Sequence, residues 1–323
     1  MATYLPFDCD PQIPPPYSLP GVTIQNFRLA ANMAQQQLLV DQYLNIGDPS
    51  ERGFYYQAYL PFVDMDFVHY PSMSYALPPF SGMGSITQNE LYFRIYVVKF
   101  IPVLDLIWLP VPAIIGFFPY MFVDNSWSMI AGREVSGFPK LLASFNGPTQ
   151  LPSQPLRPFP IEASTLAFSS IGPGVQGQMA PFVTIQTLAP DGPGNIPVNN
   201  NWTLSQTDID KLKQEDPAVA AALASVLPTG PSSVLRTVQL KQFRSAGSST
   251  DACFQAIVEG QFTASNFQFL NPQSAQIQIN AYLDLSIAAA LGLGSAMPIY
   301  PISQYAATCD LLYTQEETIF QNQ

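Results

Sequence analysis

Short apolar runs separated by proline, glycine and polar residues form the main pattern along this chain of 323 residues. Apolar and polar residues alternate over Cys253–Phe262, which is typical of a half-buried strand and places Gln255 and Glu259 on one face. A similar alternation predicts a strand over Gln276–Ile287. Further strands are predicted at Phe54–Phe62, Leu91–Phe100, Tyr120–Val123, Thr165–Ser169 and Phe182–Leu188.

Helical patterns are fewer. Leu29–Leu44 has apolar residues at helical spacing and is followed by a stop signal at residues 45–49. Asp216 and Pro217 form a helix start ahead of Ala218–Leu227. We therefore predict an α+β, β-rich fold forming one domain over residues 1–323, with an N-terminal arm (1–20) and a loop–helix insertion (189–231).

The most apolar region, Ile95–Val123, raises the question of a membrane span. Four prolines interrupt this region, and Lys99 and Asp105 lie within it. A buried strand–turn–strand segment therefore fits better than a spanning helix, and we expect no membrane attachment.

Composition narrows the function further. Hydrophobic residues make up 47% of the chain and charged residues only 11%, so we expect apolar surface to be covered in a homo-oligomer. The net charge of −11 argues against nucleic-acid binding. The N-terminus lacks a signal-peptide pattern, and three scattered cysteines fit neither a metal site nor a disulfide framework, so a reducing, cytoplasmic location is expected.

The segment with the clearest chemical potential is residues 131–140, which end in Gly137-Phe138-Pro139-Lys140. Apolar surroundings disfavour the ammonium form of a lysine, and a neutral amine can condense with a ketone to form a Schiff base. In an extended segment, Glu134 and Lys140 would face the same side, so a carboxylate and an amine could share a cavity. The alternative is an ordinary surface lysine after a turn.

The run from Gly132 to Lys140 resembles the signature of the acetoacetate decarboxylase superfamily. Residues 88–92 resemble the upstream Asn-Glu element of that family, and residues 240–244 and 252–259 resemble the C-terminal part of its longer members. The resemblance implies an antiparallel β-barrel or cone with a few peripheral helices. It also implies that Lys140 forms the Schiff base, that Glu90 is an active-site acid, and that no cofactor or metal is needed.

One position departs from the family. Acetoacetate decarboxylase has a second lysine directly after the nucleophile, whereas this chain has Leu141. Activation of Lys140 would then come from desolvation or from another cation such as Arg133. Arg133 could instead clamp a substrate carboxylate, or pair with Glu134 and brace the motif.

Three further residues are weaker candidates for substrate contact. Gln255 and Glu259 could supply a hydrogen bond or a second acid, or could be wet-face strand residues. His69 is the only histidine, so it cannot complete a histidine-rich metal site; it is either a substrate contact or a structural histidine.

The leading hypothesis is a Schiff-base-forming lyase that acts on a small-molecule keto acid or ketone, by decarboxylation or by aldol or dehydration chemistry. A non-catalytic ligand-binding scaffold of the same fold is the main alternative. A tailoring enzyme for a larger, polyketide-like substrate is a third possibility, with the apolar segments 70–80 and 103–118 lining an enlarged pocket.

Overall fold

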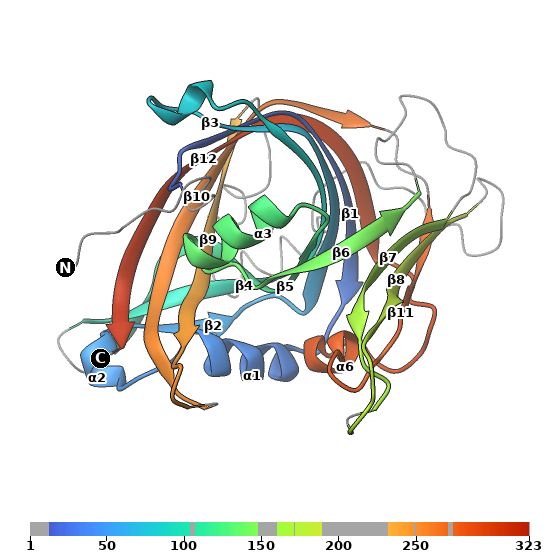
Figure 1. Cartoon of the computed structure of the whole chain (residues 1–323). Coiled ribbons are helices and arrows are strands. Elements are labelled where there is room, and N and C mark those ends of the chain that lie inside the picture. The colour runs from blue at the N-terminus through green and yellow to red at the C-terminus, as the bar shows by residue number, and fades with distance from the viewer. Residues whose placement is uncertain are drawn as a thin grey trace.

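The computed structural model describes residues 13–103, 107–147, 160–170, 172–188, 232–248, 250–270 and 274–322 (Figure 1). Its helical segments are α1 (Met33–Tyr43), α2 (Pro49–Arg52), η1 (Phe80–Gly82), α3 (Ser126–Glu134) and α6 (Ile287–Leu291). Its strands are β1 (Tyr17–Ala30), β2 (Tyr55–Ala58), β3 (Phe62–Tyr75), β4 (Ile86–Val103), β5 (Ile107–Val123), β6 (Lys140–Asn146), β7 (Pro160–Ala167), β8 (Gln178–Thr187), β9 (Ser232–Arg244), β10 (Ala252–Leu270), β11 (Ala275–Ile279) and β12 (Ser303–Asn322). Most of the predicted N-terminal arm and the whole predicted insertion at 189–231, including its helix, lie outside the described residues.

A closed barrel forms the centre of the described structure. Its strands follow the order β5-β9-β10-β12-β1-β3-β4, and pairing between β4 and β5 closes the ring. In Figure 1 these strands curve around a central space, and β6, β7, β8 and β11 continue the sheet away from β5. The pairings β5–β6 and β5–β9 are parallel, and the other pairings are antiparallel. The predicted β-rich barrel is confirmed.

The strands β3 and β4 are buried on both faces, because the barrel has an inner cavity and an outer core. In β4, Leu91 and Phe93 point outward into the main hydrophobic core, which includes residues of β8, β11 and α1. Glu90, Tyr92 and Arg94 alternate with them and line the cavity inside the barrel. Successive side chains of β4 therefore point alternately into the hydrophobic core and into the cavity, so residues that stabilise the fold alternate with residues that could contact a ligand.

Several predicted boundaries need correction. The predicted strand Gln276–Ile287 ends at Ile279, because the Asn280 side chain donates to the carbonyl of Pro181 and a turn pairs Tyr282 with Leu285. The predicted helix Leu29–Leu44 begins only at Met33, because the Asn32 side chain caps it by accepting from the amides of residues 34 and 35.

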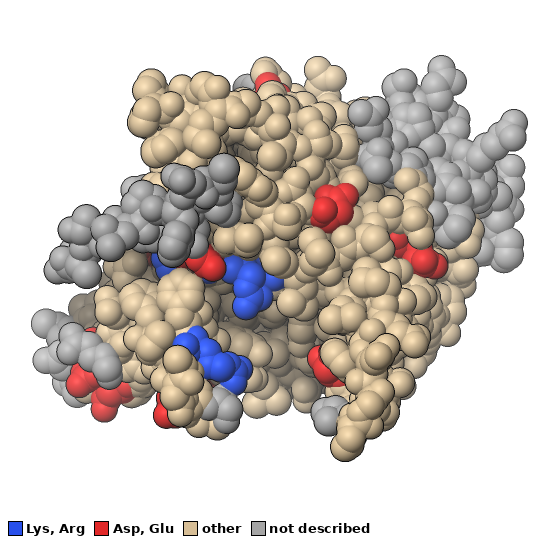
Figure 2. Space-filling view, viewed as in Figure 1, with Lys and Arg blue, Asp and Glu red and all other residues tan. Residues whose placement is uncertain are grey.

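The apolar region Ile95–Val123 forms the hairpin of β4 and β5, as predicted. No helix in the described part of the chain has the length and apolar character needed to cross a bilayer. The face drawn in Figure 2 is mostly uncharged, and the basic side chains visible on it lie beside a hollow.

Candidate active site

Lys140 is the first residue of β6, directly after a tight corner that leaves α3. The backbone of Gly137 has φ of 76°, a conformation that favours glycine. A side chain there would also meet the Lys241 backbone at 2.8 Å. The amide of Phe138 donates to the carbonyl of Gly132 at 2.9 Å, which folds the corner back onto the end of the helix. This corner turns the lysine side chain across the helix rather than out to solvent.

Gly132 provides the space through which that side chain passes. A Cβ atom at this position would lie 2.6 Å from Cδ and 2.7 Å from Cε of Lys140. Real Cβ atoms do not approach other carbons so closely. A glycine in this last turn of α3 is therefore required for the observed path of the lysine.

The Lys140 amine is buried and has two polar partners. Its Nζ donates to Oε2 of Glu90 at 3.0 Å and to Oγ of Ser128 at 2.9 Å. It also lies 5.9 Å from the centre of the Phe138 ring. The side chain of Lys140 is only 9% exposed and that of Glu90 only 5%, so this pair is shielded from bulk water.

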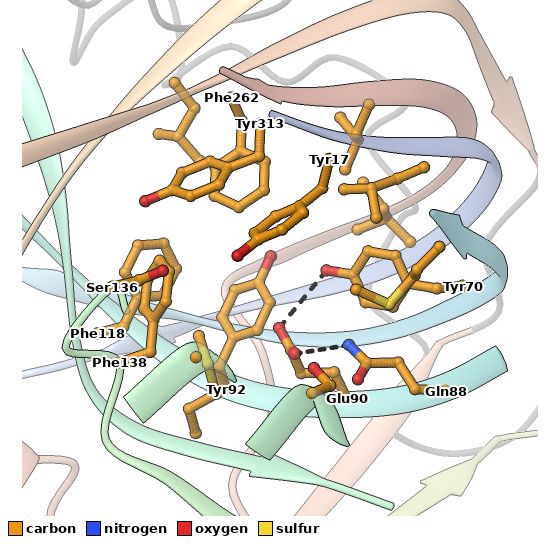
Figure 3. A pocket seen from close by; sticks show the side chains of 18 of the residues that line it. Tyr17, Tyr70, Gln88, Glu90, Tyr92, Phe118, Ser136, Phe138, Phe262 and Tyr313 are labelled. Atoms are coloured by element: carbon orange, nitrogen blue, oxygen red, sulfur yellow. Dashed lines mark hydrogen bonds between the residues drawn. The ribbon is translucent and has the colours of Figure 1, made fainter. Parts of the chain in front are cut away.

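Glu90 is held at the middle of the barrel wall by its neighbours on β3 and β4. Its Oε2 accepts from Gln88 at 2.9 Å and its Oε1 accepts from the Tyr70 hydroxyl at 3.5 Å (Figure 3). Burial and the nearby Glu90 carboxylate raise the pKa of Tyr70, so its hydroxyl stays protonated and acts as a donor. These contacts aim the carboxylate at the lysine.

A series of hydrogen bonds connects β4, the strand that carries Glu90, to the start of α3. Asp124 accepts from the backbone amide and from the side-chain amide of Asn89, at 2.8 and 2.7 Å. His69 Nδ1 lies 2.9 Å from Oδ1 of the same asparagine. Asn125 then caps α3 by accepting from the amides of Trp127 and Ser128. His69 lies in this series of hydrogen bonds and does not line the cavity.

Arg133 and Glu134 lie at the end of α3, not in an extended segment, so the predicted alternation of Glu134 with Lys140 is wrong. The helix continues through these residues because Asn125 caps its start and the Val135 amide still donates to the carbonyl of Ala131 at 2.9 Å. Arg133 is exposed, and its Nη1 donates to the backbone carbonyl of Lys140 at 3.0 Å. Neither side chain lines the cavity.

Gln255 and Glu259 face away from the cavity. Gln255 bonds with Gln242 and Asn322 across neighbouring strands. Glu259 accepts from Lys99 at 3.0 Å and from Tyr56 at 2.5 Å. Phe262, on the opposite face of the same strand, does reach the cavity. The structure therefore does not bring Gln255 or Glu259 to the lysine.

The cavity inside the barrel has a volume of about 440 Å³. Both Lys140 and Glu90 line it, together with Ser128. Aromatic side chains form much of the remaining wall, including Tyr17, Tyr92, Phe118, Phe262 and Tyr313 (Figure 3). An ion pair in a largely apolar cavity is a suitable site for chemistry that needs water excluded.

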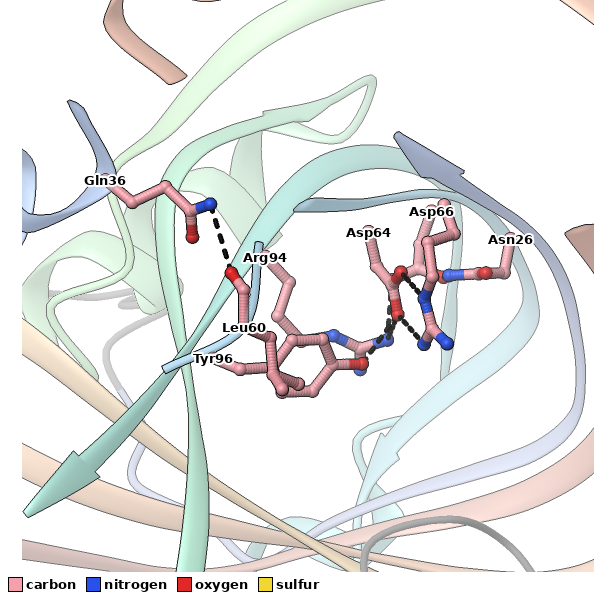
Figure 4. A network of polar contacts seen from close by, with 8 residues as sticks. Asn26, Gln36, Leu60, Asp64, Asp66, Arg94 and Tyr96 are labelled. Carbon is pink, nitrogen blue, oxygen red and sulfur yellow. Dashed lines mark hydrogen bonds and ion pairs between the residues drawn. The ribbon is translucent and has the colours of Figure 1, made fainter. Parts of the chain in front are cut away.

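A second polar network lies along the same wall (Figure 4). Arg28 binds Asp64 through two hydrogen bonds, at 2.8 and 3.0 Å, and Arg94 lies 3.3 Å from Asp64 and 3.2 Å from Asp66. Burial raises the pKa of Asp66 to about 6. Burial acts in the same direction on Asp64, but Arg28 and Arg94 outweigh it and lower the pKa of Asp64 to about 2.

A third polar group lies on the wall formed by β9, β10 and β12. Ser136 and Tyr313 line the cavity, and both hydroxyls bond to Glu316 behind it. Burial raises the pKa of Glu316. Gly260 leaves the space that the Tyr313 hydroxyl occupies.

Sequence reasoning missed several of the residues around the amine. Gln88 and Tyr92 lie two residues from Glu90 on the same face of β4, and they would have been found if the predicted strand Leu91–Phe100 had been extended back to Ile86. Ser128 carried no such signal, since α3 was not predicted. Among the described residues, no cluster of three or more histidine, cysteine, aspartate or glutamate side chains could hold a metal ion.

Comparisons with known proteins agree with this geometry. The family model "Acetoacetate decarboxylase (ADC)" matches residues 11–150, a range that contains both Glu90 and Lys140. The acetoacetate decarboxylase of Legionella pneumophila has a similar structure, with a TM-score of 0.52, 12% identity, and coverage of 95% of this chain and 88% of that chain. The first half of the chain thus matches the acetoacetate decarboxylase family model, and the described residues share the fold of acetoacetate decarboxylase.

Two other enzymes have similar structures. MppR, an enduracididine biosynthesis enzyme solved with pyruvate, gives a TM-score of 0.50 at 9% identity, with 95% and 91% of the two chains covered. An acetoacetate decarboxylase-like enzyme from Sphingomonas wittichii RW1 gives 0.50 at 12% identity, with 97% and 95% covered. No curated protein sequence matches the chain significantly. At such low identity the structural likeness establishes the fold and leaves the reaction to be argued from the site.

Proposed function

We propose that this chain is a cofactor-independent, Schiff-base-forming lyase that acts on a keto acid or a ketone. The observation that carries the proposal is the buried Lys140 amine, 3.0 Å from the Glu90 carboxylate inside a largely apolar cavity. The family match over this region and the similar fold of known acetoacetate decarboxylase-like enzymes support it.

In the proposed first step, Glu90 accepts a proton from Lys140, and the neutral amine attacks the substrate carbonyl. A carbinolamine forms, with a new bond between Nζ and the carbonyl carbon. Glu90 then returns the proton to the carbinolamine hydroxyl, which leaves as water. The product of this step is a protonated imine, and Ser128 and Glu90 remain in hydrogen-bonding reach of its nitrogen.

The imine then withdraws electrons from the adjacent carbon. If a carboxylate is attached there, carbon dioxide leaves and the bonding pair moves toward the nitrogen to give an enamine. If a proton is attached there, a base removes it and the enamine can add to an aldehyde or eliminate water. Decarboxylation and aldol or dehydration chemistry are therefore both open to the same pair of residues.

Borohydride trapping tests the proposal. The protein is incubated with a panel of keto acids and ketones, reduced with borohydride and analysed by peptide mass spectrometry. We expect a reduced adduct on Lys140 that disappears in the variant Lys140→Met and persists in the matched control Lys99→Met, whose lysine pairs with Glu259 away from the cavity.

The non-catalytic scaffold makes the opposite prediction. Ligands would bind the wild-type protein and Lys140→Met equally well, and no member of the panel would leave an adduct on Lys140. That combination would overturn the proposed function.

A further inference from the structure

The cavity is larger than a small keto acid requires. Its volume of about 440 Å³ lies within the range of roughly 300–1,000 Å³ that proteins use for drug-sized ligands. Pyruvate and acetoacetate have only a few non-hydrogen atoms, and either would leave most of the apolar wall in contact with trapped water. Burial of that wall against an apolar ligand is favourable, so the volume favours a substrate with a hydrophobic body.

The wall has a continuous set of aromatic rings suited to a flat, aromatic body. Phe118 packs edge-on against Tyr92 and Phe138, with ring centres 5.0 and 5.8 Å apart. The series continues from Phe138 to Tyr313 at 6.1 Å and from Tyr313 to Phe262 at 4.4 Å. These rings fix one another in place, and aromatic pairs with such spacings attract beyond simple burial. A ring of the substrate can join this series without reorganising it.

Each described cation that lines the cavity has an ion-pair partner; Nε of Arg94 has no hydrogen-bond partner, but this atom is fully buried and is not presented to the cavity. Among the residues that the structure describes, the cations that line it are Arg28, Arg94 and Lys140. Arg28 lies 2.8 Å from Asp64, Arg94 3.2 Å from Asp66, and Lys140 3.0 Å from Glu90. Arg133, a candidate for holding a substrate carboxylate, does not line the cavity. A buried carboxylate without a cation of its own is strongly disfavoured, so an anionic substrate has no obvious partner here.

The Tyr92 hydroxyl offers a neutral alternative. It points into the cavity near Glu90 and has no hydrogen bond to the described residues (Figure 3). It can bond to an oxygen of an uncharged ligand.

From these observations we infer that the substrate is an uncharged ketone with an aromatic body, rather than a small keto acid. This inference rests on the proposed imine at Lys140 and narrows its substrate class. A neutral ketone has no carboxylate to lose, so its imine loses a proton from the adjacent carbon to form an enamine. In the aldol direction, the enamine carbon bonds to an aldehyde carbon, and the aldehyde oxygen takes a proton. The reverse direction breaks that bond and returns the proton to a base such as Glu90.

Four ketones that vary size and charge independently test the inference. Acetone is small and neutral, pyruvate is small and anionic, 4-phenylbutan-2-one is large and neutral, and 2-oxo-4-phenylbutanoate is large and anionic. We expect 4-phenylbutan-2-one to label Lys140 under borohydride at least about tenfold faster than each of the others, a difference of about 1.4 kcal/mol in barrier. Equal or faster labelling by pyruvate or by 2-oxo-4-phenylbutanoate would overturn the inference.

The variant Asp66→Asn provides a charge control outside the proposed catalytic pair. It removes one carboxylate beside Arg94, so labelling by 2-oxo-4-phenylbutanoate should rise relative to 4-phenylbutan-2-one. An unchanged ratio in a variant that retains its circular dichroism spectrum would show that charge pairing does not set the preference.

A binding measurement separates this inference from the proposed function. Trp127 lines the cavity, so its fluorescence reports ligand binding in the unmodified protein, with Trp127→Phe as the control. If no ketone labels Lys140 but 4-phenylbutan-2-one binds more tightly than 2-oxo-4-phenylbutanoate, the imine proposal fails and the ligand preference stands. If the anionic ligand binds at least as tightly, the inference fails as well.

Discussion

Replacement of Gly132 by alanine should disable Lys140 without unfolding the protein. The new Cβ would lie 2.6 Å from Cδ and 2.7 Å from Cε of the lysine. Favourable carbon–carbon contacts are about 3.5–4.0 Å long, so the side chain must move by about 1 Å. A shift of that size would lengthen the bonds from Nζ to Ser128 and Glu90, now 2.9 and 3.0 Å, beyond hydrogen-bonding distance.

The expected effect on reactivity is large. A misplacement of about 1 Å at a reacting group can slow a reaction about a hundredfold, which corresponds to about 2.7 kcal/mol. The effect on stability should be small, because alanine is favoured over glycine inside a helix by roughly 1 kcal/mol and this gain offsets part of the steric cost.

The assay is the rate of borohydride-trapped labelling of Lys140, followed by mass spectrometry, together with a thermal melt. The control is Gly247→Ala, since a Cβ at Gly247 would meet nothing within 4 Å. Gly132→Ala should label slowly and melt near the wild-type temperature, and Gly247→Ala should match wild type in both. Wild-type labelling by Gly132→Ala would refute the argument that this glycine sets the position of the amine.

Three further predictions concern Glu90, the cap of α3 and the second polar network. Glu90→Gln should slow imine formation by about a hundredfold or more, because proton transfer by a positioned carboxylate typically contributes that much; an unchanged labelling rate would exclude Glu90 as the proton acceptor. Asn125→Ala should lower the free energy of unfolding by about 1 kcal/mol in urea titrations through loss of the α3 cap, and an unchanged midpoint would contradict the role of the cap. Because the folded state raises the pKa of Asp66 to about 6, it binds this proton more tightly than the unfolded chain, so the free energy of unfolding should fall by up to about 3 kcal/mol as pH rises from about 4 to 6. Asp66→Asn should remove most of that slope, and a parallel pH dependence in the variant would show that another group causes it.

A strand could be predicted where the residues of that segment alone showed a recognisable pattern of apolar and polar positions. The alternation in Cys253–Phe262 identified β10, and the proline-interrupted run Ile95–Val123 identified the β4–β5 hairpin. The same alternation could not tell which face met the cavity, since strands of a small barrel are buried on both sides. Glu259 therefore looked like a site residue although it lies on the outer face, and Arg94 was overlooked although it lies on the inner one.

The candidate site was predictable only in part. Lys140 and Glu90 stood out because their local motifs resemble those of a known superfamily, and the structure brings the two side chains together from positions 50 residues apart. Ser128 and the pairing of Arg28 with Asp64 depend on contacts between distant segments, and no local pattern indicates them. Arg133 and Glu134 were misplaced because a nine-residue helix was not recognised ahead of the lysine.

Lys140, the proposed nucleophile, and its partner Glu90 belong to different parts of the sheet. Glu90 lies on β4, in the closed barrel, whereas Lys140 begins β6. The strands β6, β7, β8 and β11 continue the sheet beyond the barrel, and we call them the lateral extension. The two parts are joined at this point by a parallel seam of only three residue pairs, Met121–Val123 with Lys140–Leu142. Any movement of the lateral extension relative to the barrel at this junction changes the distance between Lys140 and Glu90 directly. Hydrogen exchange should therefore report on catalysis here: faster exchange of the Leu141 and Leu142 amides should accompany slower capture of the carbonyl, even when the barrel amides stay fully protected.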